Sequence, residues 1–350
     1  MTAGLTRPRL GQLLGAYRHL TIGVVGDFFL DSYFDCDPDL DEPSLETGRT
    51  CYQVVRTRRQ AGAAGTVAAN LAALGVGTVE AVGFCGDDGE GFERTRAMAR
   101  LGLAMDGFLC VPGRFTPTYG KPTYAARRGR GWAVVEELER LDIKNRQPTP
   151  RALQDQLLAH LERRLPAWDG ALVIDQVSEA GCGVVTPRLR RFLLAAARQR
   201  PDKVMLADSR ERIRRFREVI VKPNLREAAA ALGRPRVRSL AAAQECARQL
   251  ARRSGRLVYL TLAERGMLVS DGQWVEHAPG VRVEGPIDPV GAGDSTSAAI
   301  VASLAAGATP LEAAAVANLV GSITVQQIGT TGTAPPRRIL ARFDEVARGL

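Results

Sequence analysis

The 350-residue sequence predicts an α/β fold: a mostly parallel sheet with helices on both faces, and a small β-sheet apart from it. Three observations support this fold class. From Pro150 onward, short apolar runs alternate with helical segments, which is typical of parallel strands connected by helices. Polar or glycine-rich turns follow several of these strands. Two segments, 31–57 and 116–141, alternate polar and apolar residues outside that rhythm, as strands of a half-exposed sheet do.

Hydrophobic periodicity and turn signals place the elements in order. Up to residue 101 we expect a short amphipathic helix before residue 20, strands over 21–27, 52–57 and 78–83, and helices over 62–75 and 88–101. After Pro150 we expect strands over 171–174, 203–207, 219–221 and 257–262, and helices over 151–165, 187–198, 240–252 and 296–306, with another after Asn224. Because the carboxyl ends of parallel strands meet at one edge of the sheet, ligands are expected there.

The two segments outside this alternation differ in character. After Asp31 an irregular acidic stretch, with Asp35, Asp37, Asp39, Asp41 and Glu42, lies between two strand-like pieces. A metal site could be proposed for it, but we interpret it as a solvated loop. The segment 116–141 alternates with glycine breaks and predicts a hairpin on an exposed sheet.

The charge of the chain is strongly basic, with 47 Lys and Arg against 38 Asp and Glu, a net charge of +9. The basic residues are scattered, and many fall on expected helices, where solvated faces explain them: Arg188, Arg190, Arg191, Arg212, Arg214 and Arg215. Since no aromatic-rich stripe accompanies the charge, we expect no nucleic-acid partner. An anionic substrate such as ATP or a sugar phosphate fits the charge.

Cysteine usage and hydropathy describe the expected compartment. The six cysteines are widely spaced, no pair has metal-site spacing, and the three histidines are isolated. The residues before His19 lack a continuous apolar core, so they do not read as a signal peptide. No run approaches the ~18 apolar residues that a membrane span needs. We therefore expect a cytoplasmic protein with reduced cysteines and no membrane partner.

The most informative stretch is Ile287–Ser295, which contains Gly291, Gly293 and Asp294. The expected buried helix follows it, so the glycines lie at a helix N-terminus, where unpaired N–H groups and the dipole attract anions. A carboxylate beside such a site suits the removal of a proton from a hydroxyl that attacks phosphorus. The alternative is an ordinary strand-to-helix turn with a capping aspartate.

A second candidate is the helix of small residues from Gly62 to Gly75. Thr66 and Asn70 are four residues apart, so they share one face of it. Close helix packing explains the small residues by itself. Two stacked polar side chains on such a helix equally suggest a wall that binds hydroxyl groups. The residues alone leave both interpretations open.

Over roughly residues 20 to 335 the chain resembles the ribokinase-like (PfkB) carbohydrate kinase family. Within it the chain is most similar to the heptose-phosphate kinases of ADP-heptose synthesis. The pieces that carry the resemblance are Gly26–Asp31, the Gly62–Gly75 helix, Arg140–Asp142, Lys222–Glu227, Thr261 with Gly266, and Asp288–Asp294. It implies one Rossmann-like kinase domain over 1–350 with a β-sheet lid built from 31–57 and 116–141. It also implies transfer of the ATP γ-phosphoryl group to a sugar or sugar-phosphate hydroxyl with Mg²⁺.

The resemblance also implies roles for single residues. Asp294 matches the catalytic base, and the N–H groups of Gly291, Ala292 and Gly293 match the anion hole. On the acceptor side it implies substrate contacts from Asp31, Gly62, Thr66, Asn70 and Arg140. On the nucleotide side it implies Asn224 and Glu227, which organise Mg²⁺ and phosphates through water, with Thr261, Gly266 and Asn318. Asp288, with the stretch 329–332, resembles a monovalent-cation site that would take K⁺.

Departures from the family pattern concentrate on the acceptor side. Thr66 stands where members usually carry Asn, and Gly62-Ala63 where they carry Gly-Gly; Asn70 could supply part of the lost contact. The heptose kinases have an Asp-Tyr-x-Lys-Gly element, but here the chain reads Asp175-Gln176-Val177-Ser178-Glu179. Their Asp-Pro-Lys corresponds to Asp208-Ser209-Arg210. These differences favour a sugar kinase and weaken heptose 7-phosphate as its acceptor.

Three functions therefore remain open. The first is an ATP-dependent sugar or sugar-phosphate kinase. The second is a nucleoside kinase of the same fold, with Phe28, Phe29 and Tyr33 available to stack on a base. The third is a nucleotide-binding regulatory protein without turnover. Because a small sheet standing alone leaves a face and edges unprotected, we also expect a homodimer joined through the lids. Arg127, Arg128 and Arg130 near the hairpin turn could face an anionic acceptor, although a solvated turn explains them equally.

Overall fold

A computed structural model describes residues 4–129 and 131–349, and so leaves out Arg130 of the hairpin turn. The central strands are β1 Thr21–Gly26, β6 Thr78–Gly86, β7 Ala104–Val111, β11 Gly170–Asp175, β12 Val204–Ser209, β13 Ile220–Val221, β14 Val258–Thr261, β15 Gly266–Ser270 and β16 Val275–Pro279. They form one sheet in the order β16-β15-β14-β13-β12-β11-β1-β6-β7. From β7 to β14 neighbouring strands run parallel, whereas β15 and β16 are antiparallel. The predicted mostly parallel sheet is confirmed.

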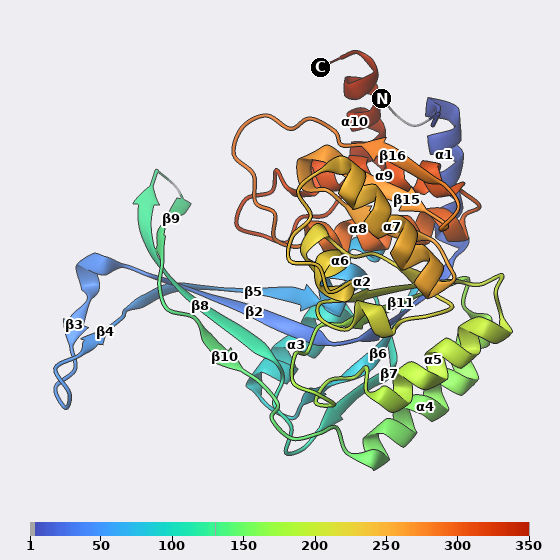
Figure 1. The fold of residues 1–350 in the computed structure, drawn as a ribbon. Coiled ribbons are helices and arrows are strands. Elements are labelled where there is room, and N and C mark those ends of the chain that lie inside the picture. Colours follow the sequence, from blue (N-terminus) through green and yellow to red (C-terminus); the bar gives the residue numbers. More distant parts are fainter. Residues whose placement is uncertain (1–3, 130, 350) are drawn as a thin grey trace.

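Helices cover both faces of this sheet (Figure 1). They are α1 Arg7–Ala16, α2 Ala64–Ala73, α3 Gly89–Arg100, α4 Arg151–Arg164, α5 Pro187–Gln199, α6 Leu225–Ala231, α7 Leu240–Ser254, α8 Ala292–Ala305, α9 Pro310–Thr324 and α10 Pro336–Ala347. Strand β1 shows how the sheet serves two cores. Val24 packs in a core that includes α2, α8 and α9, whereas its neighbour Val25 packs in one that includes α4, α5 and α7. Alternate side chains of a strand point to opposite faces, so both faces become buried.

A second sheet, here called the lid sheet, projects from the layered body toward the left of Figure 1. Its strands are β2 Phe28–Cys36, β5 Val54–Ala63, β8 Thr118–Arg128, β9 Gly131–Glu137 and β10 Leu141–Ile143. They are ordered β10-β8-β2-β5, and β9 pairs with β8 as the predicted hairpin. A small pair, β3 Glu42–Pro43 and β4 Thr50–Cys51, lies at the tip. The lid sheet is confirmed as a separate layer, but its strands begin before residue 31 and extend beyond residue 57.

The interpretation of the acidic stretch as a solvated loop is wrong for its first part. Residues up to 36 form strand β2, and Asp35 has no exposed surface. Its carboxylate accepts hydrogen bonds from Arg56 Nε at 2.6 Å, Arg58 Nη2 at 2.9 Å and Thr123 Oγ1 at 2.9 Å. Charged residues occupy inward positions of β2, so the polar–apolar pattern does not mark the strand. Only the part around residues 38–40 is an exposed turn.

Two further findings concern the chain as described. Within residues 4–129 and 131–349, no helix combines the length and the apolar character that crossing a membrane requires. The six cysteines are all free.

Candidate active site

The first turn of α8 lies at the edge where the central strands end, and Gly291 is its N-cap with φ of +78°. A side chain would be strained in this left-handed conformation. The N–H of Ala292 donates to Pro289 O at 3.1 Å, so it is engaged inside the turn. The N–H groups of Gly291, Gly293 and Asp294 donate to no residue that the structure describes. The helix start therefore offers three N–H groups to an anion. The prediction named Ala292 among them, but in the structure Asp294 takes its place.

Asp294 stands in this first turn and is half-buried. Burial, and then the nearby Asp208, raise the pKa of its carboxyl group to about 8, whereas Lys222 opposes the shift. A carboxylate with a raised pKa binds a proton more strongly, which is the property that a general base needs. The raised pKa is compatible with the role of general base, which stays a prediction for Asp294.

A buried ion pair that sequence reasoning did not assign to the site lies beside Asp294. Lys222 Nζ is 3.0 Å from Asp208 Oδ2, and both side chains are almost fully buried. Burial alone would lower the pKa of Lys222, but Asp208 and Glu227 outweigh it and raise that pKa. Ser297 of α8 also donates to Asp208 Oδ2 at 3.0 Å. The sequence did carry one signal for this pair, since Asp208 lies near the end of buried strand β12 and Lys222 directly follows buried strand β13.

Asn224 and Glu227 form a capping box at the start of α6. Asn224 Oδ1 accepts the N–H of Glu227 at 2.9 Å, and Glu227 Oε2 accepts the N–H of Asn224 at 2.9 Å. Burial, and then Asp208, raise the pKa of Glu227. One oxygen of Glu227 remains outside the box. The pair therefore serves the helix start in this structure, and its predicted metal role stays a prediction.

The remaining nucleotide-side residues lie along the same edge. The N–H of Thr261 donates to Pro223 O at 3.0 Å, which ties β14 to the turn before α6. Gly266 has φ of +87° and begins β15. Asn318 of α9 donates to the carbonyl oxygens of Ala278 and Pro279, each at 3.0 Å. Because both contacts use its amide nitrogen, only the amide oxygen of Asn318 is left for a ligand.

On the acceptor side, Asp31 of β2 is 7% exposed and lies 3.3 Å from Lys121 Nζ of β8. Burial raises the pKa of Asp31, whereas Lys121 opposes the shift. Gly62 faces this carboxylate, since a β-carbon there would lie 3.3 Å from Asp31 Oδ2. A β-carbon on Gly291 would lie 3.2 Å from Thr66 Cγ2. The starts of α2 and α8 are therefore in contact, and acceptor and phosphoryl residues meet there.

Thr66 and Asn70 do not form a surface that could bind hydroxyl groups. Thr66 is 1% exposed and its Oγ1 donates to Ala61 O at 2.6 Å. Asn70 has no exposed surface, and its Nδ2 donates to Thr66 O at 3.0 Å. The structure favours the packing interpretation of this helix. Asn70 Oδ1 is left buried without a hydrogen-bond partner in the part of the chain described.

Arg94 of α3 is a second acceptor-side residue that the sequence did not reveal. Its side chain has no exposed surface, and none of its three guanidinium nitrogens has a partner among the described residues. It lies over the ring of Phe28 at 5.4 Å. A β-carbon on Gly65 would be 1.6 Å from Arg94 Nη2, so the glycine provides the space for the guanidinium. A helix arginine reads as a solvated charge until its tertiary neighbours are known.

Arg140 precedes β10 on the rim of the lid sheet. Its Nε lies 2.7 Å from Asp142 Oδ1, and its guanidinium covers the ring of Tyr119 at 4.6 Å. About half of the side chain is exposed. The predicted substrate residue therefore lies at the edge of the acceptor side and holds Tyr119 rather than Asp31.

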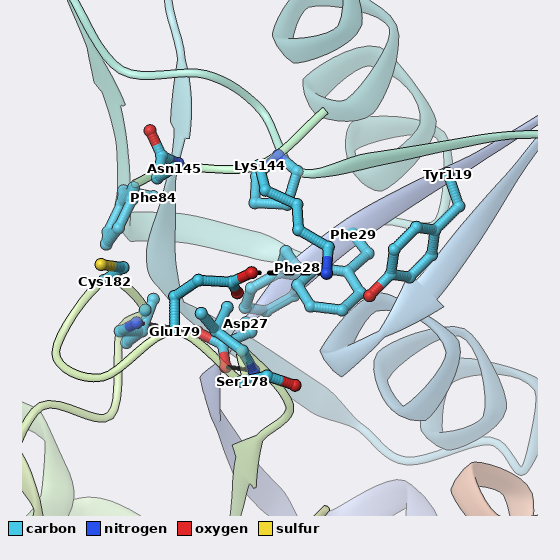
Figure 2. A pocket seen from close by; sticks show the side chains of 14 residues that line it. Asp27, Phe28, Phe29, Phe84, Tyr119, Lys144, Asn145, Ser178, Glu179 and Cys182 are labelled. Atoms are coloured by element: carbon cyan, nitrogen blue, oxygen red, sulfur yellow. Dashed lines mark hydrogen bonds and ion pairs between the residues drawn. The ribbon is translucent and has the colours of Figure 1, made fainter. Parts of the chain in front are cut away.

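A hollow of about 450 Å³, counted to its open mouth, lies under the lid sheet (Figure 2). Phe29 and Tyr119 of the lid meet edge to face at 5.2 Å, and Lys144 pairs with Glu179 at 3.4 Å across the opening. The loop 176–184 forms another wall. Buried Asp27 holds this loop by accepting the N–H groups of Gln176 at 2.8 Å, Val177 at 2.9 Å and Val184 at 2.7 Å.

The predicted cation residue Asp288 lies just before the α8 turn. Its two carboxylate oxygens accept the N–H groups of Val290 at 3.0 Å and Gly329 at 2.9 Å. Gly329 O in turn accepts from Arg58 and Gln60 of the lid sheet, each at 2.9 Å. Asp288 thus fastens the loop around residue 329, and K⁺ binding there stays a prediction.

Comparisons with known proteins concern the family and the fold of the chain. Residues 177–337 match the model of the pfkB family carbohydrate kinases. The chain is 30% identical over 322 residues to the bifunctional protein HldE of Trichlorobacter lovleyi, covering 91% of this chain and 62% of that protein. It is 30% identical over 344 residues to HldE of Pelobacter propionicus, covering 96% and 66%. The chain thus spans less than two thirds of these longer relatives.

Solved structures share the fold. Arabidopsis thaliana ribokinase, in complex with ribose and ATP, has a TM-score of 0.68 at 16% identity, over 92% of this chain and 98% of that one. Escherichia coli phosphofructokinase-2, in complex with substrates and products, has a TM-score of 0.69 at 17% identity, over 94% and 100%. The family match, the HldE relatives and the ribokinase-like fold agree with one another. The chain contains a domain of the pfkB family of carbohydrate kinases.

Proposed function

We propose that this sugar kinase transfers the γ-phosphoryl group of ATP to a hydroxyl of a sugar or sugar phosphate, with Asp294 as general base. The observation that carries the proposal is the first turn of α8. Free N–H groups and a carboxyl group of raised pKa lie there together. The same turn contacts α2, which leads to Asp31 through Gly62.

In this scheme each residue acts on a stated atom. Asp294 removes the proton of the acceptor hydroxyl as its oxygen attacks phosphorus. The free N–H groups of Gly291 and Gly293 stabilise negative charge on the transferring group. Lys222 lies 3.7 Å from the place that a β-carbon of Gly293 would occupy, so its ammonium group adds positive charge beside these N–H groups.

The donor set fits Mg²⁺ that is held largely by phosphates and water. Among the described residues no group of three or more Asp, Glu, His or Cys side chains could hold a metal alone. Mg²⁺ in kinases is bound through one or two carboxylates plus substrate phosphates. Glu227, with one oxygen free of its capping box, would be the contact, and the ion would neutralise charge on the phosphates.

The acceptor side supports a polyhydroxylated or anionic substrate. In this proposal Asp31 accepts from hydroxyl groups; Lys121 lies beside it, Lys144 lines the hollow below, and Arg140 stands at the edge. A nucleoside acceptor would need a ring that can stack on a base. Phe29 is already paired with Tyr119, which makes this second class of acceptor the less favoured one.

The lid sheet supports the proposed homodimer. Apolar side chains stand exposed on its strands, with Val135 of β9 at 65% and Leu141 of β10 at 65%, and Leu45 in the turn between β3 and β4 is 100% exposed. Clusters of exposed apolar residues mark interaction surfaces. A second lid sheet would cover them and close the open face over the acceptor.

The test is an assay of ADP release over a panel of sugars, sugar phosphates and nucleosides, with Asp294→Asn as the control for contaminating kinases. Turnover of one sugar or sugar phosphate, lost in the variant, supports the proposal. Turnover of nucleosides alone would replace the acceptor class. Binding of ATP without turnover of any acceptor would favour a regulatory protein. Equal rates in K⁺ and in a large organic cation would count against a role of Asp288 in activation.

A further inference from the structure

A second hollow lies next to the loop 176–184, away from the α8 turn. Three arginines line it: Arg190 of α5, and Arg212 and Arg215 in the turn after β12. Arg190 and Arg212 are therefore not on solvated helix faces, contrary to the expectation from the sequence. The hollow shares Val177, Glu179 and Gly183 with the one under the lid sheet, so the loop forms a wall of both.

Most charges in this hollow are satisfied within the protein. Asp175 accepts from Arg212 Nη1 at 3.0 Å and from Ser209 Oγ at 2.8 Å. Arg212 also donates to the carbonyl oxygens of Val177 and Ser178, both at 2.7 Å. Glu179 pairs with Lys144 outside the hollow. The two acidic side chains of the wall are thus already engaged.

Arg190 is the exception. It is 7% exposed, and within residues 4–129 and 131–349 its guanidinium makes no hydrogen bond and no ion pair. Its contact is a stacking arrangement over the ring of Phe216 at 5.9 Å. Burial lowers the pKa of Arg190 and the charge of Asp175 opposes that shift, but no carboxylate of the described chain lies within ion-pair distance of it. A buried charge without a hydrogen-bonded partner is costly, so an anion that enters the hollow would relieve that cost. The neighbouring Arg215 is exposed and also lacks an ion pair in the described chain.

The start of α5 adds a third contribution. This helix has 13 residues, Thr186 caps it, and Pro187 of its first turn lines the hollow. The positive end of the helix dipole therefore lies beside the two unpaired arginines. Guanidinium groups bind the oxygens of a phosphate in a fork, which a lone ammonium group does not.

We infer that this hollow is a binding site for a small phosphate-bearing molecule, distinct from the site of phosphoryl transfer. Arg190 and Arg215 hold the phosphate oxygens, and the α5 start faces the same group. Arg212 binds carbonyl groups of the loop 176–184, and Asp27 binds its N–H groups, so the loop is held from both sides. A ligand bound to Arg190 and Arg215 would therefore affect the acceptor hollow through this loop. This last step rests on the proposed function.

The test is calorimetric titration of inorganic phosphate into the full chain, with and without saturating ADP. Arg190→Gln is expected to raise the Kd for phosphate about tenfold or more, since a hydrogen bond to a charged group is lost. Arg191→Gln is the matched control, because it removes the same charge from the next, exposed position of α5. It is expected to leave the Kd within about twofold, since only weak surface electrostatics change.

Arg215→Gln provides a second reading that does not disturb a buried position, and it is expected to weaken phosphate binding several-fold. Binding that persists in ADP and falls in both variants supports the site. Binding that ADP abolishes, or that is equal in Arg190→Gln and the parent protein, would place the phosphate at α8 and overturn the inference, as would no binding at millimolar phosphate. These readings need no turnover, so they stand apart from failure of the proposed kinase activity.

Discussion

The two sides of the active site differ in their most deeply buried cations. On the phosphoryl side, Lys222 pairs with Asp208 at 3.0 Å, and Glu227 closes a capping box with Asn224. On the acceptor side, Arg94 is fully buried with three unpaired nitrogens, and Asn70 Oδ1 has no partner in the chain described. The lid sheet, which also belongs to the acceptor side, carries exposed apolar side chains.

This difference separates the reaction from its specificity. The Lys222–Asp208 pair needs no ligand to be held in place, so this part of the phosphoryl side is organised in advance. Unpaired buried groups cost stability, and that cost is relieved when a partner binds. Arg94 and Asn70 have no exposed surface, so they are a cost in stability beneath the acceptor side, where the chain also departs from its family pattern, and are not themselves ligand contacts.

The largest effect is expected on the phosphoryl side. Asp294→Asn keeps the size of the side chain but removes the base, so kcat should fall by about 10²–10⁴-fold with nucleotide binding largely kept. Steady-state kinetics with the identified acceptor and calorimetry with ATP measure the two quantities. Near-parental turnover in the purified variant would show that Asp294 is not the general base, and the phosphoryl side would then lack its proposed catalytic group.

On the acceptor side, Gly65→Ala should lower the free energy of unfolding by about 1–3 kcal/mol, because the new methyl group collides with the guanidinium of Arg94. Arg94→Met should not destabilise, since it removes an unpaired buried charge, and it should rescue Gly65→Ala in the double variant. Urea denaturation measures all three.

Gly89→Ala is the control for the glycine change, because a β-carbon there meets nothing within 4 Å. If the costs of the Gly65 and Arg94 changes simply add, the two residues are not coupled. The buried arginine would then be a structural residue, and the contrast between the two sides would weaken.

The lid sheet gives the next test. Light scattering at micromolar concentration should give about twice the mass of one chain. Val135→Asp places a charge on exposed β9 and should shift the protein toward monomer, whereas Phe92→Asp on α3, at nearly equal exposure of 66% against 65%, should not. A fully active monomer would contradict both the dimer and a lid shared between subunits.

A smaller effect is expected in the pH profile. Because the folded pKa of Asp294 is raised to about 8, its basic form grows as pH rises through that value, and kcat/KM should rise with it. Asp208→Asn removes a repelling charge and frees Lys222, so the acid limb of the residual activity should move to lower pH. Asp175→Asn, at the end of the adjacent strand β11, is the control. An unmoved limb in Asp208→Asn would assign the titration to another group.

The sequence was most informative where residues that are neighbours in the chain also form one structural feature. Glycines with an aspartate before a run of small residues predict the start of α8, because helix starts are built from neighbouring residues. The βα alternation predicts the parallel sheet for the same reason. Strand β2 was not recognised, since the partners of Asp35 come from β5 and β8 far along the chain.

The buried arginines show why the rest could not be predicted. Arg94 and Arg190 lie on helices where a solvated face is the usual reading of an arginine. Their burial depends on Gly65 and Phe216, residues that only the fold brings close. Lys222 was visible at a strand end, but its role depends on Asp208 in the neighbouring strand.

The smallest effect, and the sharpest test of the phosphoryl side, concerns Glu227. Its carboxylate both caps α6 and is the proposed contact for Mg²⁺. Glu227→Gln keeps an oxygen that can accept the N–H of Asn224, so the helix start should survive while the charge is lost. The strengthening of ATP binding by Mg²⁺ should therefore shrink by a few-fold, with thermal stability unchanged.

Glu312→Gln is the matched control, because Glu312 occupies the same position of a second capping box, with Thr309 at the start of α9. Calorimetric titrations of ATP with and without Mg²⁺ on both variants decide the matter. If the two variants keep the same metal dependence, Glu227 is a capping residue alone, and the phosphoryl side holds its metal by other groups.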